Sequence, residues 1–262
     1  MNVLGQIGAG TLARLRGGAH MAAMAWAVAA KAARPGTWTA PLRNVLARQI
    51  LFTGLEATGF VSLIALIVGV LVVVQAQYWL TRLGQTALIG PILTAVVLRE
   101  LGPLLTNFVV IARSGTAIST ELANMKVHGE VRALDAMGID PFVYLVIPRV
   151  LGVAASTFCL TIVFLGVTFV GGYACMWVIL LGDIDMGLFF GNIIGAVTVT
   201  DVFSLLAKSI LPGMLTGAIC CDEGLGVGPA ATEVPIAASR GVMRSVAALF
   251  VTSLLISVMA YL

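Results

Sequence analysis

Five long, predominantly apolar runs dominate this sequence and restrict what it can fold into. Each has about 20 residues or more, which is the length that an α-helix needs to cross the hydrocarbon core of a bilayer. Because apolar and polar residues do not alternate within them, they predict helices rather than the strands of a transmembrane barrel. The runs extend roughly over Leu55–Ala76, Leu88–Ala112, from just after Pro148 to Leu181, Val202–Cys220 and Val242–Leu262.

The composition excludes most classes of soluble protein. Of the 262 residues, 60% are hydrophobic and only 10% are charged, whereas about a quarter of the residues in a typical soluble domain are charged. A soluble fold of this length could not remove that much apolar surface from water. A soluble enzyme, a nucleic-acid-binding protein and a disordered chain are therefore excluded. The predicted fold class is an all-α integral membrane protein with five transmembrane helices.

The positions of lysine and arginine predict the orientation of the chain, because inner loops carry an excess of both. With the N-terminus inside, twelve of the 15 lie in inner segments: six precede Glu56, four lie in 113–149, and Arg240 and Arg244 lie at the inner end of the last span. Arg82 falls in an outer loop. We therefore expect a cytoplasmic N-terminus and, after an odd number of spans, a C-terminus on the outer side.

The N-terminal region is basic and contains no acid before Glu56. Such a leader is typical of a cytoplasmic flank or of an amphipathic helix lying on anionic lipid, and an organelle transit peptide is a third interpretation. The chain is thus divided into an interfacial region, 1–48, and a membrane domain, 49–262.

Several chemical functions are not expected in this chain. The sequence contains no G-x-x-x-x-G-K-[ST] motif, so it does not bind ATP by that route. The four cysteines and two histidines lack the spacing of metal ligands, and no catalytic set is apparent. Glycines four residues apart instead predict close helix packing: Gly187, Gly191 and Gly195 in the outer loop 182–201, and Gly213 and Gly217 in the fourth span.

The inner loop between the second and third spans has an amphipathic pattern. One apolar face begins after Ala112, another follows Gly129, and Gly138 and Pro141 end the pattern. This predicts two short helices along the inner surface. Such an element suits docking into a groove on another protein, or it lies in the lipid headgroup region. The first face contains Ile118, Leu122 and Met125, and the second Val131, Leu134 and Met137.

Charged residues within the spans are candidates for function, because they are costly in hydrocarbon. Arg99 and Glu100 point about 100° apart on a helix and cannot neutralise each other, so each needs its own partner or water. Pro103 leaves the carbonyl of Arg99 without its helical donor, which predicts a bend. We expect a polar pocket in which Arg99 meets a lipid phosphate; a structural ion pair is the alternative. Lys208 has a similar role or extends to the interface.

Several motifs, in order, carry a resemblance to a known family: LRELGPLL, ARSGTAISTELANMKV, ALDAMGIDPFVYLVIPR, KSILPGMLTGAICCDEGLGVG and ASRGVMRS. Together they resemble the MlaE/YrbE family, and the resemblance covers about Leu42 to Leu262. These proteins are permease subunits of ABC transporters that work with MCE proteins in lipid trafficking.

The resemblance implies an assembly. It predicts a homodimer whose protomers each have an N-terminal interfacial helix and five spans, with phospholipid moving through a cavity between them. An ATPase subunit, which binds the ATP and Mg, contacts the inner loop within 113–147. An MCE protein sits on the outer face, and a small cytoplasmic STAS-type subunit is a further partner.

The resemblance also assigns site residues. Many members carry Glu-Glu-x-Asp-Ala in the inner loop, where this chain has Gly129, Glu130, Val131, Arg132 and Ala133, so one acid is lost and another becomes a base. The residues expected to couple to the ATPase are Ile118, Glu121, Leu122, Met125, Lys126, Glu130 and Arg132. Those expected at the lipid cavity are Arg99, Glu100, Val70, Val73, Val74 and Tyr78, with Lys208 as a further functional candidate. Tyr78 and its neighbours also suit an aromatic belt at the membrane interface, and periodicity does not distinguish that role from a cavity wall.

The predicted function is therefore that of a non-enzymatic permease subunit in a bacterial inner membrane, with the chloroplast inner envelope as the alternative location. A stand-alone secondary transporter of a hydrophobic or amphipathic small molecule would predict an internal repeat with broken helices, and five spans do not divide into equal halves. An intramembrane enzyme with Glu100 as base would need a second polar group, for which Arg99 and Lys208 are available.

Overall fold

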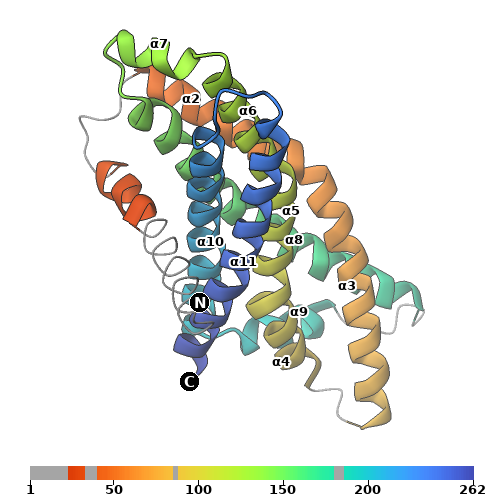
Figure 1. Ribbon diagram of the computed structural model, residues 1–262. Helices are drawn as coiled ribbons and strands as arrows, with labels where there is room; N and C mark the ends of the chain where they lie inside the picture. The colour runs from red at the N-terminus through yellow and green to blue at the C-terminus, as the bar shows by residue number, and fades with distance from the viewer. Residues whose placement is uncertain (1–22, 33–39, 85–87, 180–185) are drawn as a thin grey trace, which may run out of the picture.

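The computed structural model describes residues 23–32, 40–84, 88–179 and 186–262, and every regular element within these ranges is a helix. Among the described residues, five continuous helices are long and apolar enough to cross a membrane, as predicted. They form one elongated bundle (Figure 1). Their bounds are Ala40–Arg82, Ile89–Val127, Phe142–Val178, Val199–Leu225 and Glu233–Tyr261.

The first long helix starts well before the apolar run that predicted it. It consists of α2 (Ala40–Ile50), the π-helical segment η2 (Leu51–Leu55) and α3 (Glu56–Arg82). At 1.5 Å per residue its 43 residues extend over about 64 Å, roughly twice the hydrocarbon thickness. Residue 48, the expected domain boundary, thus falls inside α2. A short helix, Ala23–Ala32, precedes it, and the rest of the expected interfacial region before Ala40 lies outside the described residues.

The second long helix corrects the prediction for the inner loop. Its parts are α4 (Ile89–Leu93), η4 (Thr94–Leu101), α5 (Gly102–Val110), η5 (Ile111–Gly115) and α6 (Thr116–Val127). The first of the two expected surface helices is therefore α6, a direct continuation of the second span. Gly129, with a φ of 77°, ends it, because this backbone conformation favours glycine. The second, α7 (Glu130–Ala136), is separate, as predicted.

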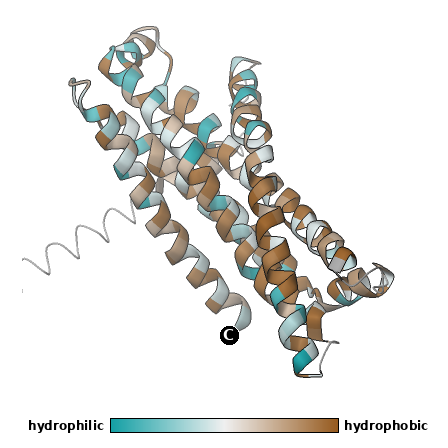
Figure 2. Ribbon diagram, turned by 90° about the vertical axis from the view of Figure 1, so that its right-hand side faces the viewer, coloured by the Kyte–Doolittle hydropathy of each residue, from teal (hydrophilic) through white to brown (hydrophobic). Residues whose placement is uncertain are grey.

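The remaining helices complete the bundle. The third long helix joins η6 (Phe142–Val146) to α8 (Ile147–Ile179), followed by α9 (Met186–Ala196), α10 (Val199–Leu225) and α11 (Glu233–Tyr261). Helices α2, α6 and α7 lie at one end, called here the α7 end; α4, α9 and the C-terminus lie at the other, the α9 end (Figure 1). Hydrophobic residues cover the middle of the bundle, and hydrophilic residues gather toward the α7 end (Figure 2).

Small residues allow the helices to approach closely. A Cβ placed on Gly69 of α3 would lie 2.5 Å from the carbonyl oxygen of Thr168 in α8, and the Thr168 hydroxyl donates to the carbonyl of Ala65 at 3.1 Å. Gly213 and Gly217 of α10 pack against α8, as their spacing predicted. By contrast, a Cβ on Gly191 or Gly195 would have no atom within 4 Å among the described residues.

Candidate functional site

A buried lysine joins the second and fourth spans. Lys208 of α10 is 1% exposed, and its Nζ lies 2.7 Å from Oε1 of Glu100 in η4. The same ammonium donates to the carbonyl of Arg99 at 2.8 Å. That carbonyl is the one that Pro103 leaves without a helical donor. Ser257 of α11 also donates to Glu100, at 2.9 Å, so this carboxylate of the second span contacts the fourth span and the fifth.

A second ion pair lies closer to the α9 end. Nε of Arg99 is 2.8 Å from Oδ1 of Asp201, whose side chain is fully buried near the start of α10. Asp201 also accepts hydrogen bonds from the backbone N–H of Thr198 at 2.9 Å and from the hydroxyl of Tyr261 at 2.9 Å. The Tyr261 ring lies under the Arg99 guanidinium, 4.7 Å away. Asp201 therefore has two roles: it caps the N-terminus of α10, and it holds the Arg99 guanidinium in position.

These contacts confirm that Arg99 and Glu100 each have a separate partner. The π-helical segment η4 ends just before α5, and Pro103 is the second residue of α5. The contacts contradict the idea that Lys208 extends to the interface, because its ammonium is directed into the bundle. Sequence reasoning missed Asp201 and Tyr261 as partners. A signal was present, since Asp201 is the acid three residues after Thr198 at the start of the fourth span, which is the pattern of a capping box.

The two pairs form a network of two cations and two anions with no net charge, here called the polar network (Arg99, Asp201, Glu100 and Lys208). Its inner members are covered, but the side chains of Glu100 and Arg99 are 45% and 29% exposed. The network therefore joins the second and fourth helices, and its hydrogen bonds with Ser257 and Tyr261 add the fifth. It still presents polar atoms on one face of the chain.

The candidate cavity residues of the first span do not form one surface. Val73 is fully buried and packs against Gly172 of α8, so it belongs to the core. Val70 and Val74 are partly buried and Tyr78 is exposed, with the Arg82 guanidinium 4.6 Å from its ring. None of the four lines the apolar groove of about 470 Å³ between α3 and α4, which is formed by Leu71, Val72, Gln75, Ala76, Trp79, Leu80, Leu83 and Ile92.

The candidate coupling residues also separate into two groups. Ile118 and Leu122 are 1% and 0% exposed and belong to the main core with the partly buried Met125. The structure thus assigns these apolar residues to internal packing rather than to a docking surface, because α6 packs between α10 and the start of α11. Glu121, paired with Arg149 at 3.1 Å, is exposed on the other side of α6, and Lys126 is partly exposed.

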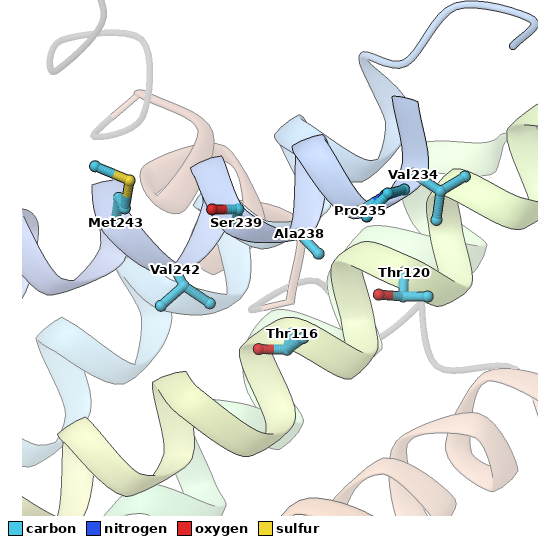
Figure 3. A pocket seen from close by; sticks show the side chains of 8 residues that line it. All are labelled: Thr116, Thr120, Val234, Pro235, Ala238, Ser239, Val242 and Met243. Carbon is cyan, nitrogen blue, oxygen red and sulfur yellow. The ribbon is translucent and has the colours of Figure 1, made fainter. Parts of the chain in front are cut away.

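Helix α7 carries the exposed members of this set. Glu130 and Arg132 both lie on its surface, and every residue of α7 is at least partly exposed. Helices α6 and α11 border a groove of about 600 Å³, to which α6 contributes two threonines and α11 mainly apolar side chains (Figure 3). It is lined by Thr116, Thr120, Val234, Pro235, Ala238, Ser239, Val242 and Met243.

Comparison with known proteins identifies the family. The family model described as Permease MlaE matches residues 46–259. A probable ABC transporter permease protein of Synechocystis is 30% identical over 215 residues, which cover 82% of this chain and 81% of the relative. A probable ABC transporter permease of Rickettsia typhi is 28% identical over 218 residues, 82% of each chain.

A plant protein is also similar. The Arabidopsis thaliana protein named TRIGALACTOSYLDIACYLGLYCEROL 1, chloroplastic, is 32% identical over 220 residues, which cover 82% of this chain and 61% of the relative. The family match covers all five long helices except the first residues of α2 and the end of α11, and it includes the whole polar network. The chain therefore belongs to the MlaE family of ABC transporter permeases.

Proposed function

We propose that two copies of this chain form the membrane pathway of an ABC transporter that moves phospholipid or a related lipid between the membrane and an MCE protein on the outer side. A separate ATPase supplies the energy, and a small STAS-type subunit accompanies it. Family membership and the relatives named as ABC transporter permeases support the ATPase. The plant relative, whose name is that of a galactosylated diacylglycerol, supports a diacyl lipid as cargo.

The observation that carries the proposal is the exposed side of the polar network. A charged side chain at the bilayer centre costs roughly 2.5–3.5 kcal/mol on insertion scales. The exposed parts of Glu100 and Arg99 are therefore unfavourable against acyl chains and favourable on a polar pathway between two copies. On that pathway the free part of the Arg99 guanidinium contacts a lipid phosphate, while Asp201 and Tyr261 fix its orientation.

The α7 end is the proposed site of the ATPase. Glu130 and Arg132 on α7, with Glu121 and Lys126 on α6, supply its polar contacts, and the buried face of α6 transmits the displacement into the core. The proposed location is a bacterial inner membrane with the N-terminus cytoplasmic and the C-terminus periplasmic. The plant relative named chloroplastic supports the chloroplast envelope as the alternative.

The native complex, purified in mild detergent, tests this proposal through its protein partners and bound lipids. Glu130→Lys should weaken ATPase association and leave bound lipid unchanged, with Glu130→Gln as the control that removes the charge without reversing it. Arg99→Ala should do the opposite, because it removes a cation from the pathway. ATP-independent transport of a small molecule by the isolated chain would instead support a secondary transporter and contradict the proposal.

A further inference from the structure

Three π-helical segments lie at the α7 end, one in each of the first three long helices. They are η2, η5 and η6. π-Helical turns are rare in proteins and often mark functional sites, and they are among the few identifiable causes of a bend in a long helix. The fourth and fifth long helices are described as regular α-helices at this end, so these segments separate the first three helices from the other two.

Side chains from other helices contact the carbonyls of η2 and its neighbourhood. Nη1 of Arg113, in η5, donates to the carbonyl of Phe52 at 3.0 Å. The hydroxyl of Ser156, in α8, donates to the carbonyl of Ile50 at 3.4 Å. The irregular part of the first helix is therefore held from the second helix and from the third.

Arg113 makes two more contacts with the same turn. Its Nη2 lies 2.7 Å from Oε2 of Glu56, and its guanidinium lies 5.2 Å from the centre of the Phe52 ring. The two side chains of the ion pair are 32% and 59% exposed, and exposed pairs contribute only about 0–1 kcal/mol to stability. The arrangement thus fixes the relative position of two helices more than it stabilises the fold.

A second arginine ties α6 to the third long helix. Arg149 of α8 is 7% exposed, and its Nη2 lies 3.1 Å from Oε1 of Glu121 in α6. Its Nη1 contacts the carbonyl of Tyr144, in η6, at 3.5 Å. Arg113, just before the start of α6, thus ties the second long helix to the first. Glu121, near the middle of α6, ties it to the third.

We propose that Arg113 and Arg149 are positioning residues that transmit a displacement of α6 to the first and third spans through η2 and η6. This inference rests on the proposed function, in which the ATPase acts on α6 and α7. Each arginine joins a carboxylate to a carbonyl of a π-helical segment, so a shift of α6 pulls on the backbone at the points where these two helices bend most readily.

The test uses the complex of the full chain with its copurified ATPase in liposomes, with ATP hydrolysis and lipid transfer measured together. In Arg113→Gln and Arg149→Gln, ATP hydrolysis should stay close to that of the wild type. The amount of lipid moved per ATP should fall at least about fivefold, which is the lower end of the range of factors that typical allosteric coupling produces. Arg113→Lys should recover part of the loss. Arg48→Gln, an exposed arginine of α2 at the same end, is the matched control and should have no effect.

A second measurement does not depend on transport. Backbone amide exchange in peptides covering 50–56 and 142–147 of the full chain should become faster in Arg113→Gln and Arg149→Gln respectively, and not in Arg48→Gln. An unchanged ratio of lipid to ATP in folded variants, or unchanged exchange, overturns the inference. If the wild-type complex itself moves no lipid, the proposed function fails, and the exchange result then decides alone whether the two ties exist.

Discussion

The Lys208–Glu100 pair offers the most direct measurement of what holds the membrane helices together. Lys208→Met keeps the length of the side chain but removes an ammonium that is 1% exposed and contacts Glu100 at 2.7 Å and the Arg99 carbonyl at 2.8 Å. Breaking a buried pair by removing one partner costs about 3–5 kcal/mol. Because the Glu100 side chain is 45% exposed, we expect the lower end, about 3 kcal/mol.

The assay is thermal unfolding of the purified chain in detergent or nanodiscs, with reversibility checked by rescanning. For a chain of this size, 1 kcal/mol shifts the Tm by about 2–4 °C, so the expected decrease is roughly 6–12 °C. The double variant Lys208→Met/Glu100→Gln leaves no unpaired charge at this pair and should recover most of that loss. Lys126→Met, in the partly exposed part of α6, should shift the Tm by no more than about 2 °C, the range of an ordinary surface change.

The double-mutant comparison can refute the reasoning. If Lys208→Met and Glu100→Gln lower the Tm independently, so that their effects add in the double variant, the two side chains do not form a pair in the folded protein. A loss in Lys208→Met that is no larger than in Lys126→Met would have the same meaning, because it would show that the ammonium makes no significant contact within the bundle.

Two further changes test other parts of the packing by the same Tm assay. Gly69→Ala should destabilise the chain by about 1–3 kcal/mol, because its Cβ would meet the backbone of Thr168; Gly59→Ala, in the same helix with no atom within 4 Å, should be neutral or stabilising by up to about 1 kcal/mol. Asp201→Asn should cost about 2 kcal/mol, since it keeps an oxygen for the N-terminus of α10 but loses the charge paired with Arg99. Equal losses for the two glycine variants, or no loss for Asp201→Asn, would contradict these accounts.

The membrane topology could be predicted from sequence because hydrophobic length is a local property. Each apolar run is sufficient to identify its own helix, and all five were found. The ends of the helices were less predictable, since polar segments such as Ala40–Ile50 and Thr116–Val127 continue a helix when nothing breaks it. Helix α9 was missed because its 11 residues are too few to span a bilayer and lie in a segment that reads as a loop.

The candidate site could be predicted only where one residue is costly by itself. Arg99, Glu100 and Lys208 stand out because charges are rare in apolar runs. Their pairing is set by how the helices cross, and no local pattern indicates that Lys208 meets Glu100 and not Asp201. The apolar residues of α6 show the converse limit, because the same i, i+4 stripe is produced by a docking surface and by a helix that packs into its own core, as Ile118 and Leu122 do.

The polar network has a consequence for how the chain is synthesised and inserted. Arg99 and Glu100 emerge from the ribosome about 100 residues before Asp201 and Lys208, their partners. During that interval the second span carries two uncompensated charges, each costing roughly 2.5–3.5 kcal/mol in hydrocarbon. Stable partition of this span into lipid therefore requires the fourth span, and a nascent chain arrested between the two should leave the second helix at the translocon or in a protein-lined environment.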